Sequence, residues 1–369
     1  MLTLARNGYS ADQVRRALHA AHRTMKFRYE LLSSSNQFKA HLTNVLSGHV
    51  GYNSLAQIKR TGRFSMRDDG SVNFLSDRLK PYALLKMPDG GWTEWPLGVF
   101  VLSTPPRRAD DAGVVTREVE AYDLLQVLVD DKVTDRYTIP AGANYITEVK
   151  VLLDSAGITA QNLTATDKTL PADRDWDPGT TKLQIINDLL GAVNYRSLWF
   201  DENGVAVAQP YVSPTVRASE YTYRDDDESV IFPEVQQSLD LFAVPNQWVL
   251  YVSEADRPPL RSVYTNTNPA SPTSTVNRGR TIVAEPKQVD AADQATLDAL
   301  AQREAFEASQ VYEQVEFETA VMPFHSDLDC LTLEFSTLGI ADKYVETAWE
   351  FELRADARMR HRIRKVVNV

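Results

Sequence analysis

Both ends of this chain alternate apolar and polar residues at a period of two, and this pattern restricts the fold more than any other feature. The alternation runs through 25–31 near the N-terminus and recurs at 315–321 and 345–353 near the C-terminus. Side chains of a strand point to opposite faces in turn, whereas those of a helix repeat every 3.6 residues. The two ends of the 369-residue chain are therefore predicted to form antiparallel strands with one buried face.

The stretch between 123 and 210 differs, because its apolar residues recur at helical spacing. Its clearest segment is "TTKLQIINDLLGAVNYRSLWFDENGVAV", which starts with a capping box at Thr181 and Gln184. Asn203-Gly204 near its end marks a tight turn between two short strands. The segment is predicted to be a helix followed by a hairpin, and nothing in it has a catalytic pattern.

These patterns divide the chain into four parts. We expect an N-terminal helical segment over 1–23, a first β unit (barrel or sandwich) over 24–122, a small α/β domain over 123–210 and a second β-barrel over 211–369. A stretch at 263–281 is rich in Thr, Ser, Asn and Pro, which favours a long loop. An Ala-rich stretch at 290–312 favours a helix that crosses the second barrel.

The composition excludes several classes of protein. The formal net charge is -11, whereas a generic DNA-binding domain is basic. Cys330 is the only cysteine, so an intrachain disulfide and a Cys-based zinc site are both excluded. The sequence has neither the run of about 18 apolar residues that a membrane helix needs nor a signal-peptide core in residues 1–24. We therefore expect no membrane segment.

Some residues have ligand chemistry, but each group has a simpler interpretation. His19 and His22 are spaced to share a metal, yet no third ligand follows, so we interpret them as a solvated helix face. The stretch 325–330 mixes His, Asp and Cys, but it leads into a strand and favours a turn. The acidic residues at 173–177 resemble the start of a calcium loop, yet its sixth position holds Pro178 instead of Gly.

Motifs of common enzymes are missing from the sequence. It contains no G-x-S-x-G, no P-loop and no dinucleotide-binding glycine turn. We therefore predict that the chain is not an enzyme, and we expect no catalytic residue, no cofactor and no metal.

The succession of segments resembles that of phage tail hub proteins. This group includes the baseplate hub of contractile tails and the N-terminal hub region of tail-associated proteins in long noncontractile tails. The resemblance covers about residues 24–369 and lies in the order of the segments, since no single motif is diagnostic. The matching segments are "EWPLGVFVLSTP", "EVEAYDLLQVLVDDKV", "YTIPAGANYITEVKVLLDSAGI", "TTKLQIINDLLGAVNYRSLWFDENGVAV", "VPNQWVLYV", "NTNPASPTSTVNRGRT" and "FHSDLDCLTLEF".

The resemblance implies a mainly β (α+β) fold, with two antiparallel β-barrel tube-like domains, an inserted small α/β domain and a crossing helix. It also implies a homotrimeric ring in the virion, which closes the tail tube and adapts a six-fold tail to a three-fold tip. The implied partners are a distal tail or tail tube protein ring, the tape measure protein and tip or fibre proteins. Phage DNA would pass through the channel without specific binding, and an acidic chain suits this because like charges repel. Assembly would take place in the cytoplasm of the bacterial host.

The C-terminal segment "RMRHRIRKVV" suggests where such a ring makes contact. Four arginines fall on one face of the predicted strand, at Arg358, Arg360, Arg362 and Arg364. They form either a solvated basic face or a contact with an acidic surface of a neighbouring subunit or another tail protein.

Other functions stay open at this stage. The chain could be another structural component of a phage tail or of a contractile injection machine. A carbohydrate-binding β module would show a row of exposed tryptophans on one sheet face. A carboxylate hydrolase would show two acids that converge in a deep cleft.

Overall fold

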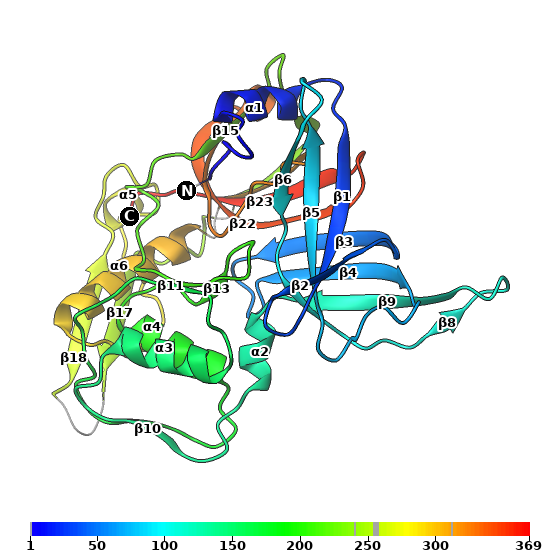
Figure 1. Cartoon of the computed structure of the whole chain (residues 1–369). Coiled ribbons are helices and arrows are strands. Elements are labelled where there is room, and N and C mark those ends of the chain that lie inside the picture. The colour runs from blue at the N-terminus through cyan, green and yellow to red at the C-terminus, as the bar shows by residue number, and fades with distance from the viewer. Residues whose placement is uncertain (1, 240, 254–257, 311–312) are drawn as a thin grey trace.

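The computed structural model describes residues 2–239, 241–253, 258–310 and 313–369, and its largest element is a 15-stranded, mostly antiparallel sheet (Figure 1). The N-terminal half supplies β1 (Met25–Leu32), β2 (Phe38–Leu42), β3 (Val45–Asn53), β4 (Arg60–Arg67), β5 (Arg78–Lys86), β6 (Trp92–Pro96), β7 (Phe100–Leu102), β8 (Arg108–Ala109) and β9 (Val115–Tyr122). The C-terminal half supplies β15 (Tyr221–Arg224), β16 (Ile231–Leu239), β20 (Glu313–Ala320), β21 (Cys330–Phe335), β22 (Ile340–Glu352) and β23 (Arg358–Lys365).

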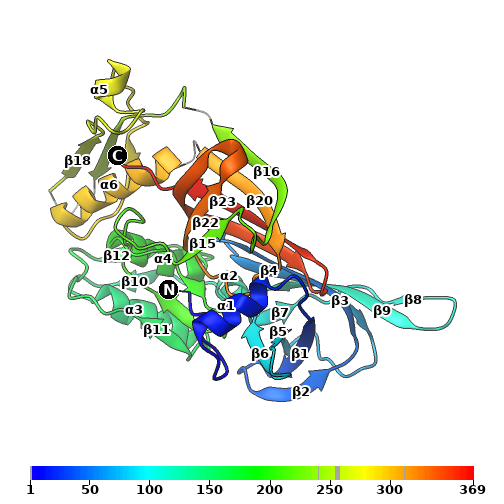
Figure 2. The same cartoon turned by 90° about the horizontal axis from the view of Figure 1, so that it is seen from above.

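The two halves are hydrogen-bonded into one sheet. Its main order is β16-β20-β23-β22-β3-β4-β9-β7-β5-β1-β2, and the antiparallel pair β22–β3 is the junction. β16 and β2 lie at the two ends of this order (Figure 2). A mainly β fold with antiparallel strands at both ends of the chain is therefore confirmed. Among the described residues this order is open, so closure of each half into a barrel stays a prediction.

The largest hydrophobic core lies on the inner face of this sheet and takes residues from both halves. Phe64 and Met66 of β4 and Met359 and Ile363 of β23 are completely buried in it. The helix α1 (Ala11–His19) covers part of this core with its apolar residues. A capping box starts α1, since the Ser10 and Gln13 side chains each bond the other's backbone N–H.

The insert after β9 has a core of its own. Its elements are α2 (Leu125–Asp130), β10 (Tyr137–Ile139), α3 (Tyr145–Ser155), β11 (Gln161–Leu163), β12 (Arg174–Trp176), α4 (Lys182–Ala192), β13 (Trp199–Phe200) and β14 (Ala206–Ala208). Thr181 caps α4 as predicted, since its hydroxyl accepts from the Gln184 N–H at 3.1 Å. β13 and β14 form the predicted hairpin, and β11 adds to β14 in parallel. The apolar faces of α3 and α4 meet in the second hydrophobic core.

A third packing unit lies within the range predicted as a single second barrel, 211–369. β17 (Gln247–Val252), β18 (Leu260–Thr265) and β19 (Lys287–Gln288) form a separate three-stranded sheet, on which α6 (Gln294–Gln310) packs. The predicted helix 290–312 is thus shorter at its start, and 311–312 lie outside the described residues. The alternation of residues along β17 shows which face is buried but does not specify which sheet the strand joins.

The predicted loop 263–281 is more ordered than its composition suggested. β18 continues to Thr265, and a short helix, α5 (Thr275–Arg278), follows. Buried polar residues hold the segment: the Asn246 side-chain amide donates to the carbonyls of Thr273 and Arg280, at 3.2 and 3.0 Å, and its oxygen accepts from the Ile282 N–H at 2.8 Å. Asparagine side chains here satisfy backbone groups that no sheet or helix satisfies.

A 3-10 turn, η1 (Ser336–Leu338), connects β21 to β22.

Candidate assembly surface

One face of the strands β20, β23, β22, β3, β4 and β9 carries ionisable side chains, and we call it the charged face. It follows from the period-two pattern, because the alternate residues of the same strands fill the core. Its members are half-buried or exposed and are Glu316, Glu318, Arg358, Arg360, Arg362, Glu350, Glu352, His49, Arg63, Glu118 and Glu120.

Strand register places opposite charges side by side on the charged face. Arg360 of β23 lies between Glu318 of β20 and Glu350 of β22. In the next row, Arg63 of β4 lies opposite Glu120 of β9, and His49 of β3, whose other neighbour is Glu352 of β22, lies on the far side of Arg63. Opposite charges directly across strands stabilise a sheet, whereas like charges there destabilise it.

The charged face is hollowed in its middle. A depression of about 640 Å³ is lined by β3, β4, β9 and the end of β22, and a second of about 330 Å³ extends toward β23. The two share His49, Thr61 and Glu350. The junction between the two halves of the sheet therefore lies on the floor of a concave, polar surface.

Three of the four predicted interface arginines have carboxylate partners within the chain. Arg358 pairs with Glu318 at 3.1 Å, and Glu316 accepts from Arg360 at 2.7 Å and from Arg362 at 3.0 Å. Burial would raise the pKa of Glu316, but the bonds and charges of Arg360 and Arg362 outweigh it, so its pKa lies below the usual value. The signal for these acids is in the sequence, because Glu316 and Glu318 alternate with buried residues at period two on β20.

The fourth arginine, Arg364, has a different environment. Its side chain is half-buried, and its Nε is buried with no hydrogen-bond partner among the described residues. Burial, followed by the charge of Arg362, lowers the pKa of the Arg364 guanidinium. The structure thus places three of the arginines on the charged face, each beside a carboxylate, and half-buries the fourth beside them.

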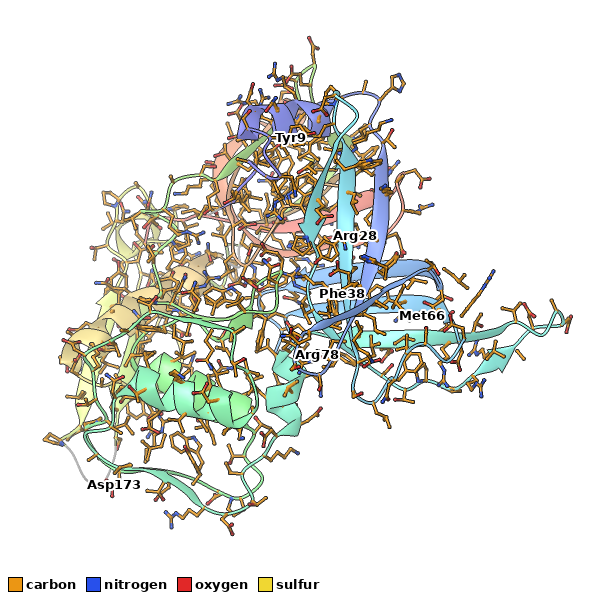
Figure 3. The ribbon with its side chains drawn as sticks, in the orientation of Figure 1. Tyr9, Arg28, Phe38, Met66, Arg78 and Asp173 are labelled. Carbon is orange, nitrogen blue, oxygen red and sulfur yellow. The ribbon has the colours of Figure 1, made fainter. Side chains whose placement is uncertain are left out.

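Within the described residues, His19, His22 and the acidic residues at 173–177 do not converge as ligands. His19 contacts the Glu228 carbonyl at 2.7 Å and the Tyr221 hydroxyl at 2.5 Å, while His22 is exposed. Asp175 pairs with Arg136 at 2.5 Å. Asp173, labelled in Figure 3, accepts from the Ala141 N–H at 2.8 Å, so the acidic stretch is used in local backbone and ion-pair contacts.

The sequence did not reveal a larger cluster of side chains of the kind that bind metals. His325, Glu346 and His361 come together in the core behind β23, where all three are buried. The stretch 325–330 was interpreted as a turn, and a turn does lead into β21 there. Its partners lie on two later strands, so spacing alone contains no signal for them.

Comparisons with known proteins agree on the fold. No protein-family model matches the sequence, and no curated protein matches it either. A tail protein from Neisseria meningitidis has a similar solved structure, with a TM-score of 0.64 and 13% identity, over 92% of this chain and 97% of that one. The 43 kDa tail protein of prophage MuSo2 from Shewanella oneidensis gives 0.60 and 10% identity, over 91% and 98%.

A third similar structure comes from an assembly. A chain of the Francisella PdpA–VgrG complex gives a TM-score of 0.56 and 10% identity, over 94% of this chain and 59% of that one. The fold of this chain is therefore one that phage tail proteins have, and it also occurs in a chain of a VgrG complex. The resemblance predicted from the order of segments is confirmed at the level of the fold.

Proposed function

We propose that this chain is a structural hub protein of a phage tail tip or baseplate, and that three copies form a ring around a channel. The single observation that carries the proposal is the junction of the two β units into one long sheet through β3 and β22. Three such chains supply six β units, which matches a six-fold tail tube on one side and a three-fold tip on the other.

The ends of the sheet support a ring. Among the described residues β16 pairs with β20 alone and β2 pairs with β1 alone, so each presents an open edge. Open edges need pairing or cover. β16 of one copy meeting β2 of the next would be a head-to-tail contact, which gives a closed ring when the rotation closes. Phe38, at the start of β2 (Figure 3), is 56% exposed and would be covered there.

The proposal assigns a role to each part of the chain. The units 24–122 and 211–369 are the tube-like domains, completed as barrels by their own strands or by neighbours, and 1–23 is a helical segment packed on them. The domain 123–210 is peripheral and acts as a spacer, without an enzymatic role. The charged face, with Arg358, Arg360 and Arg362, and the adjacent Arg364 contact a neighbouring subunit or another tail protein.

The proposed position at the tail tip or baseplate also implies the remaining partners. The ring would meet a distal tail or tail tube protein ring, the tape measure protein and tip or fibre proteins, and DNA would pass without specific binding. The location is the virion, after assembly in the bacterial host cytoplasm. Among the described residues, no helix is long and apolar enough to cross a membrane.

One alternative has support from a specific observation. The similarity to a chain of the PdpA–VgrG complex favours a related component of a contractile injection machine as the second candidate. A carbohydrate-binding surface lacks the row of exposed tryptophans that would support it, because five of the six are at most 6% exposed.

The test is the oligomeric state of the full chain. Native mass spectrometry and negative-stain images of tail tips are expected to show a hollow three-fold ring. Phe38→Lys is expected to weaken the trimer about 10-fold, in the range of an interface anchor. Leu75→Lys, at a position 87% exposed outside the strands, is the matched control. Tail tips without a trimer of this chain would refute the proposal.

A further inference from the structure

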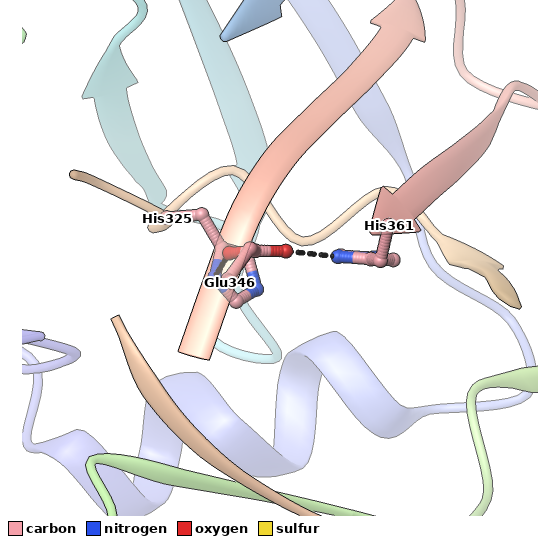
Figure 4. Close-up of side chains that lie close together, drawn as sticks. All are labelled: His325, Glu346 and His361. Carbon is pink, nitrogen blue, oxygen red and sulfur yellow. Dashed lines mark hydrogen bonds and ion pairs between the residues drawn. The ribbon is translucent and has the colours of Figure 1, made fainter. Parts of the chain in front are cut away.

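A fully buried group of side chains of the kind that bind metals lies in the core behind β23 (Figure 4). His325 comes from the segment before β21, Glu346 from β22 and His361 from β23, and their ligand atoms lie within 4.8 Å of one another. The two carboxylate oxygens of Glu346 are divided between the histidines: Oε1 lies 2.6 Å from His361 Nδ1, and Oε2 lies 2.6 Å from His325 Nδ1. Asp329 Oδ2 lies 3.2 Å from the same His325 nitrogen.

The second nitrogen of each ring faces a hydroxyl. His361 Nε2 lies 2.8 Å from Thr319 Oγ1, and His325 Nε2 lies 2.6 Å from the Tyr223 hydroxyl. Thr319 donates its only hydroxyl proton to the Ala320 carbonyl at 2.8 Å, so it accepts from His361 Nε2–H. This arrangement leaves Nδ1 of a neutral His361 with its lone pair directed at Glu346. Metal-bound histidines show the same pattern, in which the distal N–H donates to an oxygen.

The charge of the group favours a cation. Glu346 and Asp329 are both buried, with 0% and 3% of their side chains exposed. Buried carboxylates need a compensating charge, because burying an unpaired ion costs several kcal/mol. A divalent cation neutralises both carboxylates while both imidazoles stay neutral, as metal ligands must be.

We propose that these residues form a structural site for one divalent transition metal of the zinc class. The ligands are His325 Nδ1, His361 Nδ1 and one oxygen each from Glu346 and Asp329. Two imidazoles and two carboxylates suit Zn²⁺ in tetrahedral coordination, whereas Mg²⁺ prefers six oxygens. Ligand bonds of about 2.0–2.1 Å place the donor atoms roughly 3.3 Å apart. The contacts of 2.6 Å would therefore widen, and atoms of the group that lie farther apart, within the 4.8 Å limit, would approach one another.

The metal would connect elements that are distant in sequence. The segment before β21 meets β22 through a backbone bond, from the Glu346 N–H to the Asp329 carbonyl at 2.9 Å, and through the side chains of His325 and Asp329, whereas β22 and β23 pair along their backbones. A bound ion would therefore fix this segment against the sheet beneath the charged face. This inference is independent of the proposed function.

The first experiment uses the full wild-type chain, purified without metal-affinity steps and dialysed against EDTA. After addition of one equivalent of Zn²⁺ and gel filtration, inductively coupled plasma mass spectrometry is expected to find about one Zn²⁺ per chain. Zn²⁺ is expected to raise Tm, Mg²⁺ to leave it unchanged, and Co²⁺ to give the visible spectrum of a tetrahedral site. Absence of retained zinc together with an unchanged Tm would show an ion-pair cluster only and overturn the proposal.

Variants locate the site. Glu346→Gln keeps the shape and removes the charge, and it is expected to abolish zinc retention. Thr319→Val removes the acceptor behind His361 and is expected to weaken zinc binding 10–100-fold, as changes behind metal ligands do. If Glu346→Gln does not fold, the zinc affinity of Thr319→Val tests the site instead. His22→Gln, at an exposed position, is the matched control. Unchanged zinc affinity in Thr319→Val would contradict the assignment.

Discussion

Tyr52 of β3 and Trp349 of β22 lie directly opposite each other across the junction of the two sheet halves, with their rings stacked 5.8 Å apart at 17°. The Arg60 guanidinium lies 5.0 Å from the first ring and 5.5 Å from the second, and it donates to the Leu97 carbonyl at 2.8 Å. Tyr52 also donates its hydroxyl to Asp327 at 2.8 Å. The junction is therefore held by aromatic packing around a buried cation, in addition to backbone pairing.

Truncating this junction is expected to destabilise the whole chain. Trp349→Ala should lower the free energy of unfolding by about 3–5 kcal/mol, since Trp349 is 3% exposed and its removal leaves a cavity. Trp92→Ala is the matched control, because Trp92 is only half-buried and should cost clearly less. Urea unfolding monitored by circular dichroism measures both. Equal losses of unfolding free energy in the two variants would show that the junction does not contribute more to stability than the half-buried site at Trp92.

Asp123, at the start of the insert, is expected to make stability depend on pH. Burial raises its pKa to about 6, although the Arg60 and Leu125 N–H groups, at 2.9 and 3.0 Å, oppose this. The folded state thus binds the proton more tightly than the unfolded state, whose pKa is near 3.8. Asp123 therefore adds to the free energy of unfolding below about pH 4. This contribution, up to about 3 kcal/mol, is lost as the pH rises through about 6.

The variant Asp123→Asn isolates this effect. Its free energy of unfolding should lack the decline between about pH 4 and pH 6, whatever its absolute value. The measurement is a series of urea titrations across that range for both proteins, and the difference between the curves is the readout. Parallel curves would mean that Asp123 does not titrate in this way.

The arginines of the charged face are expected to matter for assembly more than for folding. Arg358→Ser, Arg360→Ser and Arg362→Ser together should cost about 1–2 kcal/mol or less in the isolated chain, since exposed ion pairs contribute little. Tail assembly should fail or become more sensitive to salt. Arg354→Ser is the control, since Arg354 is exposed and pairs only loosely with Asp356 at 3.6 Å. Normal infectious tails from the triple variant across a range of salt would identify the arginines as a solvated face.

The hydrogen bonds of the buried Asn246 side chain are expected to protect the segment 263–281 from proteases. Asn246→Ala leaves two carbonyls and one N–H without their partner, and such buried groups cost about 1–3 kcal/mol each. Limited proteolysis of the free protein should then cleave within 266–281 much faster than in the wild type. Thr267→Ala, at an exposed position, should cleave at the wild-type rate. Similar cleavage in all three proteins would show that Asn246 does not order the segment.

Local features of this protein were determined by the sequence alone. The capping residues Ser10 and Thr181 each bond a backbone N–H three residues ahead, so the sequence contains the whole interaction. The alternation at 315–321 is equally local, because each strand residue points away from its neighbours whatever strand lies beside it. The class of fold followed from the order of such segments.

Only the tertiary structure decided which distant segments meet. Pairing of β3 with β22, separation of β17 from the large sheet and the meeting of His325 with His361 all depend on which partner a strand finds. Alternation specifies that a strand has one buried face, but the same pattern fits many partner strands. Selection among them depends on the fit of packed cores and on hydrogen bonds between residues far apart in the chain, and these contacts exist only when the chain has folded.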